Sequence, residues 1–358
     1  MEAKLSEFAS VTPATTTTVE GSRSSVPSPS GRFARAAALA LGLVLLIYLL
    51  AHLGGREILS MLLAIRWTLL PVLMLYGGHQ ALRAMALTLC VPRPGGLRYL
   101  DAVAVRLAGE AVQYLTFSGP VVAEPTKAWL LGRRGLTTWE GLAATLAEYL
   151  ASSFAAAVMA VAGLGYVLSA LHPRGAVRVA AIAVLVAMTT FALLCIIGIA
   201  MRLHIIGGIV RGATRLPLVR GRARPRAQGV RQAEDLLIHT LRDHPGRLVA
   251  VVATESAAQL CLGVELFCLL AVLQPPFTLG RAMLIEGATK FITAGYFFVP
   301  GQVGVAEGTY AVIFNAFAIP SAAGLAVSFV RRLRSIVTAC LGLLAFSVLT
   351  RVQVEAPP

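Results

Sequence analysis

Two short motifs place a carboxylate within otherwise apolar parts of the chain. One reads VAEPT at residues 122–126 and the other reads VAEGT at residues 305–309. Glu124 and Glu307 each come just after a break in the apolar pattern, where a returning helix would begin. A carboxylate there can accept hydrogen bonds from free backbone N–H groups and complement the positive end of the helix. Coupling to protons or to a substrate is the alternative role, because charges inside a membrane are costly and usually mark a pathway or a buried pair.

Glycine and proline residues make the break in front of each motif. Proline lacks a backbone N–H and glycine is conformationally free, so both disfavour a continuous helix. The apolar segment is therefore predicted to turn back on itself before each glutamate. The residues expected to form these turns are Gly119, Pro120, Pro300, Gly301 and Gly304.

Basic residues accompany both motifs. Arg331, Arg332 and Arg334 lie in a long apolar segment that follows the second motif. Arginine binds phosphate bidentately, so the three together predict a site for an anionic lipid head group. Internal ion pairs are the alternative, and Glu148–Arg331 is one candidate. Lys127, which follows the first motif, could collect phosphate at the membrane face or belong to a solvated basic cluster.

The chain aligns with itself over three blocks in the same order. The first two pairs are separated by 183 residues and the third by 177, so the copies differ by a few residues at the turn. Similar composition alone would not keep the glutamate and threonine in phase. The blocks 122–126, 141–148 and 107–116 match 305–309, 324–331 and 284–293.

The composition places the chain in a membrane. It is 57% hydrophobic and 13% charged, whereas a soluble domain carries about 25% charged residues. Runs of about 20 apolar residues, the length that crosses a bilayer as a helix, recur along it. The fold class is therefore all-α and polytopic, with about six full spans predicted at residues 36–53, 60–82, 138–170, 177–201, 247–273 and 322–349.

Two less apolar regions, 100–130 and 278–318, are predicted to be re-entrant helical hairpins that enter and leave the membrane on one face. Three spans lie between the two motifs, and an odd number means that the second hairpin enters from the opposite face. Inverted repeats with discontinuous helices that meet near the bilayer midplane are typical of transporters with a central site.

Charge sets the predicted orientation and the domain boundaries. The net charge is +14, and arginines crowd the connection at 202–247, which marks a cytoplasmic loop and places the N-terminus on the same side. The Ser-, Thr- and Pro-rich start of the chain has the composition of a disordered tail. The predicted parts are a tail at 1–31, one transmembrane domain at 32–350 with repeats at about 32–201 and 248–350, and a short tail at 351–358.

Catalytic and cofactor motifs were sought and not found. The sequence has no GxSxG, HExxH or Walker pattern, and its cysteines and histidines lack metal-ligand spacing. We therefore expect no enzyme activity, no metal and no cofactor. Nucleic acid is not an expected partner either, because no recognition motif accompanies the basic charge.

The stretches "VPGQVGVAEGTY" and "AVSFVRRLRSIVTACLGLLAF" resemble the C-terminal signature of the flippase-like membrane domain of lysylphosphatidylglycerol synthases. "GPVVAEPTKAWLLGRRG" resembles an earlier block of that domain, and the likeness covers roughly residues 35–350. The chain looks closest to stand-alone members associated with hopanoid biosynthesis, although Gln302 and Ala123 replace glycines common in the family. The synthases' aminoacyl-transferase domain has no counterpart here, so lysyl transfer is not expected.

This resemblance implies a lipid flippase or transporter that moves an amphipathic lipid between leaflets by alternating access. The lipid would be anionic and phosphate-bearing, or of hopanoid type. The expected location is a bacterial cytoplasmic (inner) membrane, and the expected partners are membrane lipids and lipid-biosynthesis enzymes. The alternative is a non-transporting accessory subunit of a lipid-modifying or glycolipid-synthesising enzyme.

Overall fold

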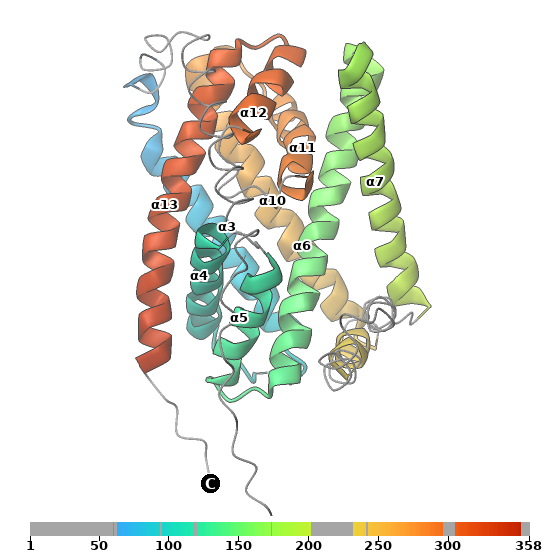
Figure 1. Cartoon of the computed structure of the whole chain (residues 1–358), viewed down its shortest axis with the longest axis vertical. Coiled ribbons are helices and arrows are strands. Elements are labelled where there is room, and N and C mark those ends of the chain that lie inside the picture. The colour runs from blue at the N-terminus through green and yellow to red at the C-terminus, as the bar shows by residue number, and fades with distance from the viewer. Residues whose placement is uncertain are drawn as a thin grey trace, which may run out of the picture.

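A computed structural model of the chain defines the fold, and every regular element in the part it describes is a helix (Figure 1). Most of these helices stand side by side along one direction, as a membrane-spanning bundle requires. The structure describes residues 60, 63–93, 95–116, 120–172, 174–201, 232–240, 243–295 and 305–351. The predicted tail at 1–31, the span at 36–53, most of the arginine-rich loop and all but the first residue of the predicted tail at 351–358 lie outside these residues.

Long apolar helices form the frame of the bundle. By length and composition, four segments of the described chain can cross a membrane, and they confirm four of the predicted spans. The chain is thus a multi-pass membrane protein. The segments are Thr138–Ala170, Ala181–Gly198, Pro245–Leu273 and Ser321–Arg351. The helices that contain them are α6 (Thr138–Tyr166), continued by the π-helical η1 (Val167–Leu171), α7 (Gly175–Ala200), α10 (Pro245–Leu273) and α13 (Ser321–Arg351).

The span predicted at 60–82 was wrong in its bounds. The helix there is α3 (Leu69–Cys90), which begins after a turn at residues 66–68. It is not among the four candidate spans of the described chain, and its centre carries the polar pair His79 and Gln80. The helix continues past residue 82 because its second half faces buried groups of other helices, which hydropathy alone does not register.

Two pairs of short helices replace full spans where hairpins were predicted. The first pair is α4 (Tyr99–Leu115) and α5 (Pro120–Gly132), and the second is α11 (Leu279–Gly295) and α12 (Val305–Ala316). Figure 1 shows the first pair in the lower half of the bundle and the second in the upper half. At about 1.5 Å per residue each helix is too short to cross about 30 Å of hydrocarbon.

Of the five residues predicted to form the turns, one lies in the described part of the chain. Pro120 is the first residue of α5, a position where its missing N–H costs nothing. The other four, Gly119, Pro300, Gly301 and Gly304, lie outside the described residues.

Two glycines related by the 183-residue offset make the same kind of contact in the two halves. Gly141 of α6 lies so close to α5 that an added Cβ would be 2.8 Å from the Ala128 carbonyl oxygen. Gly324 of α13 lies against α12, where an added Cβ would be 2.9 Å from the Tyr310 carbonyl oxygen. The aligned blocks therefore occupy matching places, because each long helix approaches its preceding short helix at the same glycine.

The packing between the halves is reciprocal. Gly342 lets α13 of the second half lie directly on Leu107 of α4 in the first half. Gly163 lets α6 of the first half lie on Leu284 of α11 in the second half. Leu107 and Leu284 are aligned at the 177-residue offset, so each half contributes its long helix to cover the first short helix of the other.

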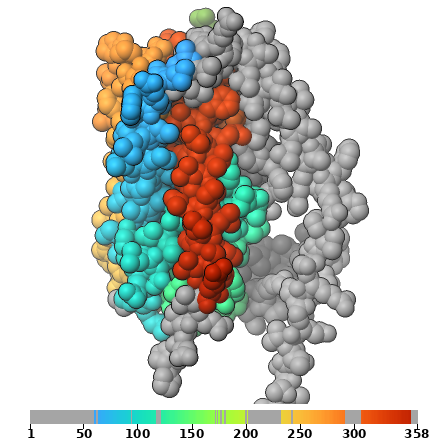
Figure 2. All heavy atoms as spheres, turned by 90° about the vertical axis from the view of Figure 1, so that its left-hand side faces the viewer, coloured from blue at the N-terminus to red at the C-terminus, as the bar shows by residue number. Residues whose placement is uncertain are grey.

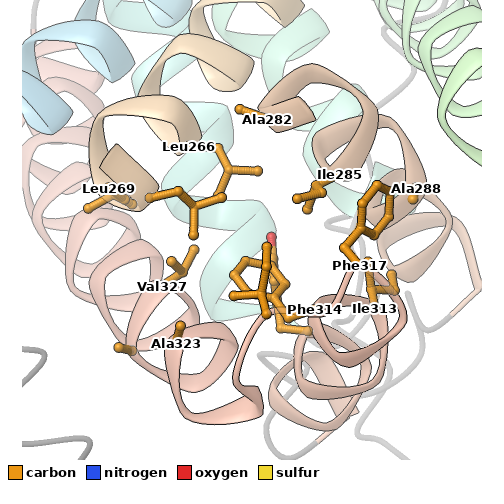
Figure 3. Close-up of a cluster of buried hydrophobic side chains, with 14 of the residues drawn as sticks. Leu266, Leu269, Ala282, Ile285, Ala288, Ile313, Phe314, Phe317, Ala323 and Val327 are labelled. Atoms are coloured by element: carbon orange, nitrogen blue, oxygen red, sulfur yellow. The ribbon is translucent and has the colours of Figure 1, made fainter. Parts of the chain in front are cut away.

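Apolar side chains fill the bundle on both sides of its centre. One core lies among α3, α4, α5 and α6, and the other among α10, α11, α12 and α13. Figure 3 shows the second core, built from Leu266, Leu269, Ala282, Ile285, Ala288, Ile313, Phe314, Phe317, Ala323 and Val327.

The outer face of α13 is apolar and exposed. The helix runs along the surface seen in Figure 2, with α4 beside its lower half. Exposed apolar side chains are what a lipid-facing helix presents. Those on α13 are Leu333, Ile336, Val337, Leu341, Leu343, Leu344 and Val348.

Candidate functional site: two clusters of buried charges

The charged residues inside the bundle fall into two clusters, one in each half. Buried ions are expensive unless they are paired, so each cluster must be held together by its own contacts. The N-terminal cluster consists of Arg83, Arg106, Glu110, Glu124, Lys127, Glu148 and Glu255. The C-terminal cluster consists of Glu265, Glu286, Lys290, Glu307, Arg331, Arg332 and Arg334.

Glu148 of α6 is the centre of the N-terminal cluster. Its side chain is fully buried and receives three cations from three other helices. Arg83 of α3 lies 2.6 Å away, and Arg106 of α4 and Lys127 of α5 each lie 3.2 Å away. One carboxylate thereby joins α3, α4, α5 and α6.

The other carboxylates of the N-terminal cluster surround these cations. Lys127 Nζ lies 2.8 Å from Glu124 Oε1, three residues before it on α5. Arg106 lies 3.7 Å from Glu110, one turn later on α4. The motif glutamate Glu124 is thus an ion-pair partner within its own short helix.

Arg331 of α13 is the centre of the C-terminal cluster. Its guanidinium lies 3.2 Å from Glu265 of α10 and 2.6 Å from Glu286 of α11. It also donates to the Tyr310 hydroxyl of α12 at 2.5 Å. One arginine therefore joins α10, α11, α12 and α13, as Glu148 joins the helices of the other half.

The remaining C-terminal residues extend this network. Lys290 Nζ lies 2.7 Å from Glu286, Arg334 pairs with Glu265, and Arg332 pairs with Glu307. Glu307 is fully buried in the first turn of α12, where the positive helix end favours an anion.

Tyr76 of α3 connects the two clusters. Its hydroxyl donates to Glu110 at 2.9 Å and accepts from Gln80 at 3.1 Å. The Arg334 guanidinium carbon lies 3.8 Å from the centre of the Tyr76 ring, a close cation–π contact. The same side chain therefore touches an anion of one cluster and a cation of the other.

The structure places all seven predicted site residues in these clusters. Glu124, Lys127 and Glu148 come together in one, and the other four come together in the second. The suggested Glu148–Arg331 pair was wrong, because each residue is the centre of a different cluster with partners from its own half. Of the open alternatives for the ionisable residues, internal pairing describes the observed contacts.

Sequence reasoning left half of the two clusters out of the predicted site. A usable signal was present, since each missed residue is an ionisable group inside a helix of the bundle. What the sequence lacked was the rotation of α3 and α10, which decides whether such a group points inward. The missed members are Arg83, Arg106, Glu110, Glu255, Glu265, Glu286 and Lys290.

Each cation of these clusters already has a carboxylate partner, and arginine and lysine are the groups that hold phosphate in proteins. A phosphate-bearing head group would have to compete with those carboxylates. The N-terminal cluster has three cations and four carboxylates, and the C-terminal cluster has four cations and three carboxylates.

The long apolar helices and the paired charges buried between them place the chain in the class of multi-pass membrane proteins. The chain matches the model of the lysylphosphatidylglycerol synthase TM region over residues 35–342, and it belongs to that family. Regions of this family are associated with lipid translocation. The match does not support assignment to the hopanoid-associated subgroup. Comparison with curated proteins and with solved structures gave no match.

Proposed function

We propose that the protein is a lipid transporter that moves an amphipathic, phosphate-bearing lipid between the leaflets of a bacterial cytoplasmic membrane. The observation that carries this proposal is the pair of buried charge clusters at two pairs of short helices, in a family associated with lipid translocation. Charges so deep in an apolar bundle usually belong to a substrate or ion pathway. No chemical change of the lipid is part of the proposal, so the protein acts without enzyme activity.

The short helix pairs are proposed to be re-entrant hairpins of two inverted repeats. Support comes from their places at opposite ends of the bundle in Figure 1. It also comes from the matching glycine contacts at Gly141 and Gly324. With the arginine-rich loop on the cytoplasmic side, as the positive-inside rule favours, the α5–α6 connection would be cytoplasmic and the α12–α13 connection would face outward.

The head group is proposed to bind by partner exchange. Arg332 is the most exposed cation in the C-terminal cluster, with 23% of its side chain accessible. A lipid phosphate would take Arg332 from Glu307 and then contact Arg331 and Arg334. In the other half, Glu124 and Lys127 would exchange partners in the same way. In each half the basic side chain would leave its glutamate only when a head group binds.

Reconstitution into liposomes tests this function. Purified protein would be inserted into vesicles that contain one of several fluorescent lipids with different head groups, and a membrane-impermeant quencher would report movement between leaflets. We expect at least one phosphate-bearing lipid to move faster than in empty vesicles. Glu307→Gln should slow this movement at least tenfold, because Arg332 loses the partner that controls its release.

A matched control separates a site effect from damage to the fold. Ser347→Ala alters an exposed hydroxyl of α13 that bonds only to the neighbouring Leu344 carbonyl, and it should leave translocation unchanged. If no lipid in the panel moves faster than in empty vesicles, the transporter proposal is wrong.

The extensive pairing of the buried charges also fits a non-transporting accessory subunit of a lipid-modifying enzyme. In that case the charges only hold the helices together. Glu307→Gln and Arg332→Gln would then lower the stability of the protein. The activity of a partner enzyme isolated together with it would fall only as far as the folded fraction of the protein falls.

A further inference from the structure

The N-terminal cluster carries an uncompensated carboxylate. Four glutamates face three cations, so the cluster holds one excess negative charge when all groups are ionised. An isolated buried charge is costly, and a group in that position neutralises or gains a counter-ion. The contacts indicate which of the four glutamates is in excess.

Glu255 of α10 has the weakest contacts of the four. Its side chain is fully buried, and its one ion-pair contact is Arg83 Nε at 3.4 Å. Neither carboxylate oxygen has a well-formed hydrogen bond within the described part of the chain, where the Ser152 hydroxyl of α6 is placed to donate only weakly to Glu255. Glu148 accepts hydrogen bonds from Arg83, Arg106 and Lys127. Glu110 accepts one from the Tyr76 hydroxyl.

A second unpaired acceptor lies one helical turn away. The Gln259 side chain is 6% exposed, and its Oε1 atom also lacks a partner among the described residues. Residues four apart on a helix are neighbours, so the Glu255 and Gln259 side chains lie on the same face of α10. Two unpaired acceptors on one helix face can share a donor, and a proton on Glu255 would supply it.

We propose that Glu255 is a proton-binding site, occupied by one proton when the N-terminal cluster has the contacts described above. The proton comes from solvent and forms an O–H bond with one carboxylate oxygen, which then donates to Gln259. The charge of the cluster changes from minus one to zero, and release of the proton restores the excess charge. The claim that Glu255 binds a proton depends on the contacts alone. The claim that this proton drives lipid movement rests on the proposed transport function.

Charged and titratable neighbours surround Glu255 on several helices. They are Arg83 and Cys90 of α3, Arg106 of α4 and Glu148 of α6, and His79 of α3 lies beside Ala258, three residues further along α10. Ser152 of α6 also faces the carboxylate. His79 is already committed at Nδ1, which lies 2.8 Å from the Ala258 carbonyl oxygen and must donate to it. The remaining cations are engaged by better-placed carboxylates.

Glu124 is the competing site and supplies a matched control. Its Oε2 atom also lacks a partner in the described chain, but its Oε1 atom lies 2.8 Å from Lys127 Nζ. The ammonium at that distance favours the charged form of Glu124 against the cost of its burial, and Glu255 has no cation as close. Glutamine at either position has the shape of a protonated glutamate, so Glu255→Gln and Glu124→Gln test the two sites without changing side-chain size.

Infrared difference spectroscopy of the purified full chain in lipid nanodiscs tests the site directly. A protonated carboxylic acid has a carbonyl band distinct from that of a carboxylate. We expect wild type at neutral pH to show a band equivalent to one protonated carboxyl per chain, and Glu255→Gln to lose it. Glu124→Gln should keep the band. Loss of the band in Glu124→Gln, or its absence from wild type, would overturn the proposal.

Thermal unfolding shows whether each variant folds. Glu255→Gln should melt within about a degree of wild type, because it copies the protonated form. A loss of more than about ten degrees would mean that the negative charge itself is required, and that result would contradict the proposal.

A vesicle experiment separates this inference from the transport proposal. With a pH gradient across the membrane, lipid movement by wild type should accelerate several-fold, and Glu255→Gln should not respond to the gradient. If the infrared band behaves as expected but no lipid moves, the transport proposal fails and the proton site stands. If lipid moves but the band is absent from wild type, the proton site fails and the transport proposal stands.

Discussion

The two buried clusters occupy matching places in the two halves of the chain but have opposite signs at their centres. Glu148 and Arg331 are related by the 183-residue offset, and each joins four helices of its own half. Glu148 gathers cations, whereas Arg331 gathers carboxylates. The number of helices joined is the same at the two centres, whereas the charge of the central residue differs in sign.

This exchange of sign suggests a division of labour. The N-terminal cluster has one carboxylate in excess and suits a cation, which we infer to be a proton. The C-terminal cluster has one cation in excess and suits an anion such as a lipid phosphate. Two identical clusters would compete for the same ligand, whereas two opposite ones can bind different ligands at the same time.

Neutralising Glu148 or Arg331, the centres of the two clusters, should have the largest effect on the free energy of unfolding. Glu148→Gln leaves three buried cations without their shared anion, and Arg331→Gln leaves two buried carboxylates without their shared cation. Removing one partner of a buried ion pair costs about 3–5 kcal/mol, so each variant should lose stability on that scale. Unfolding in mixed detergent micelles measures this, and Arg351→Gln at the exposed end of α13 is the control. A loss under about 1 kcal/mol in either centre would remove that residue from its central role.

A double-mutant cycle shows whether the two centres act separately. Arg83→Met combined with Glu148→Gln should give a coupling energy of about 0.5–3 kcal/mol, as residues in direct contact do. Glu148→Gln combined with Arg331→Gln should be additive within about 0.5 kcal/mol, because they share no direct partner. A large coupling energy between the two centres would support a direct Glu148–Arg331 contact and contradict the separate clusters.

Adding a methyl group at the matching glycines tests the equivalence of the halves. Alanine at position 141 or 324 would place Cβ under 3 Å from a backbone carbonyl of the preceding short helix. Overpacking of this kind costs about 1–3 kcal/mol, and the two variants should lose similar amounts. Gly77→Ala is the control, because that helical glycine has open space around it. Its expected effect is a gain of up to about 1 kcal/mol from helix propensity. A clear difference between the two variants would argue against matching packing.

Removing the Tyr76 hydroxyl should have the smallest effect. Tyr76→Phe keeps the ring beneath Arg334 but leaves Glu110 without its donor. A single hydrogen bond contributes about 1 kcal/mol, or somewhat more to a charged group, so the loss should stay in that range. Gln80→Leu removes the donor to the same hydroxyl and also an acceptor of Arg106, so it should cost more than Tyr76→Phe, and the double variant should cost less than the sum of the two. Full additivity of the two changes would mean that Tyr76 does not transmit between the clusters.

The sequence predicted the helices better than it predicted their contacts. Four spans and the two pairs of short helices followed from hydropathy and from the glycine and proline breaks. The self-alignment brought Glu148 and Arg331 into register as equivalents, and equivalence was then mistaken for contact. Their true partners, Arg83 and Glu265, lie on helices whose rotation depends on packing against distant segments. Hydropathy carries no information on that rotation. It also does not define helix ends, and the span predicted from residue 60 corresponds to a helix, α3, that begins at Leu69.

Cysteine labelling at equivalent ends of the two halves tests the central claim, that the halves face opposite sides of the membrane. Thr138 and Pro320 are exposed residues at the α5–α6 and α12–α13 connections. Each would be changed to cysteine in a chain whose five native cysteines are replaced by alanine, and probed in intact cells with a membrane-impermeant thiol reagent. The account predicts that only Pro320→Cys reacts from outside and that Thr138→Cys reacts only after the cells are opened. Reaction of both positions from the same side would contradict the inverted arrangement and the transport path built on it.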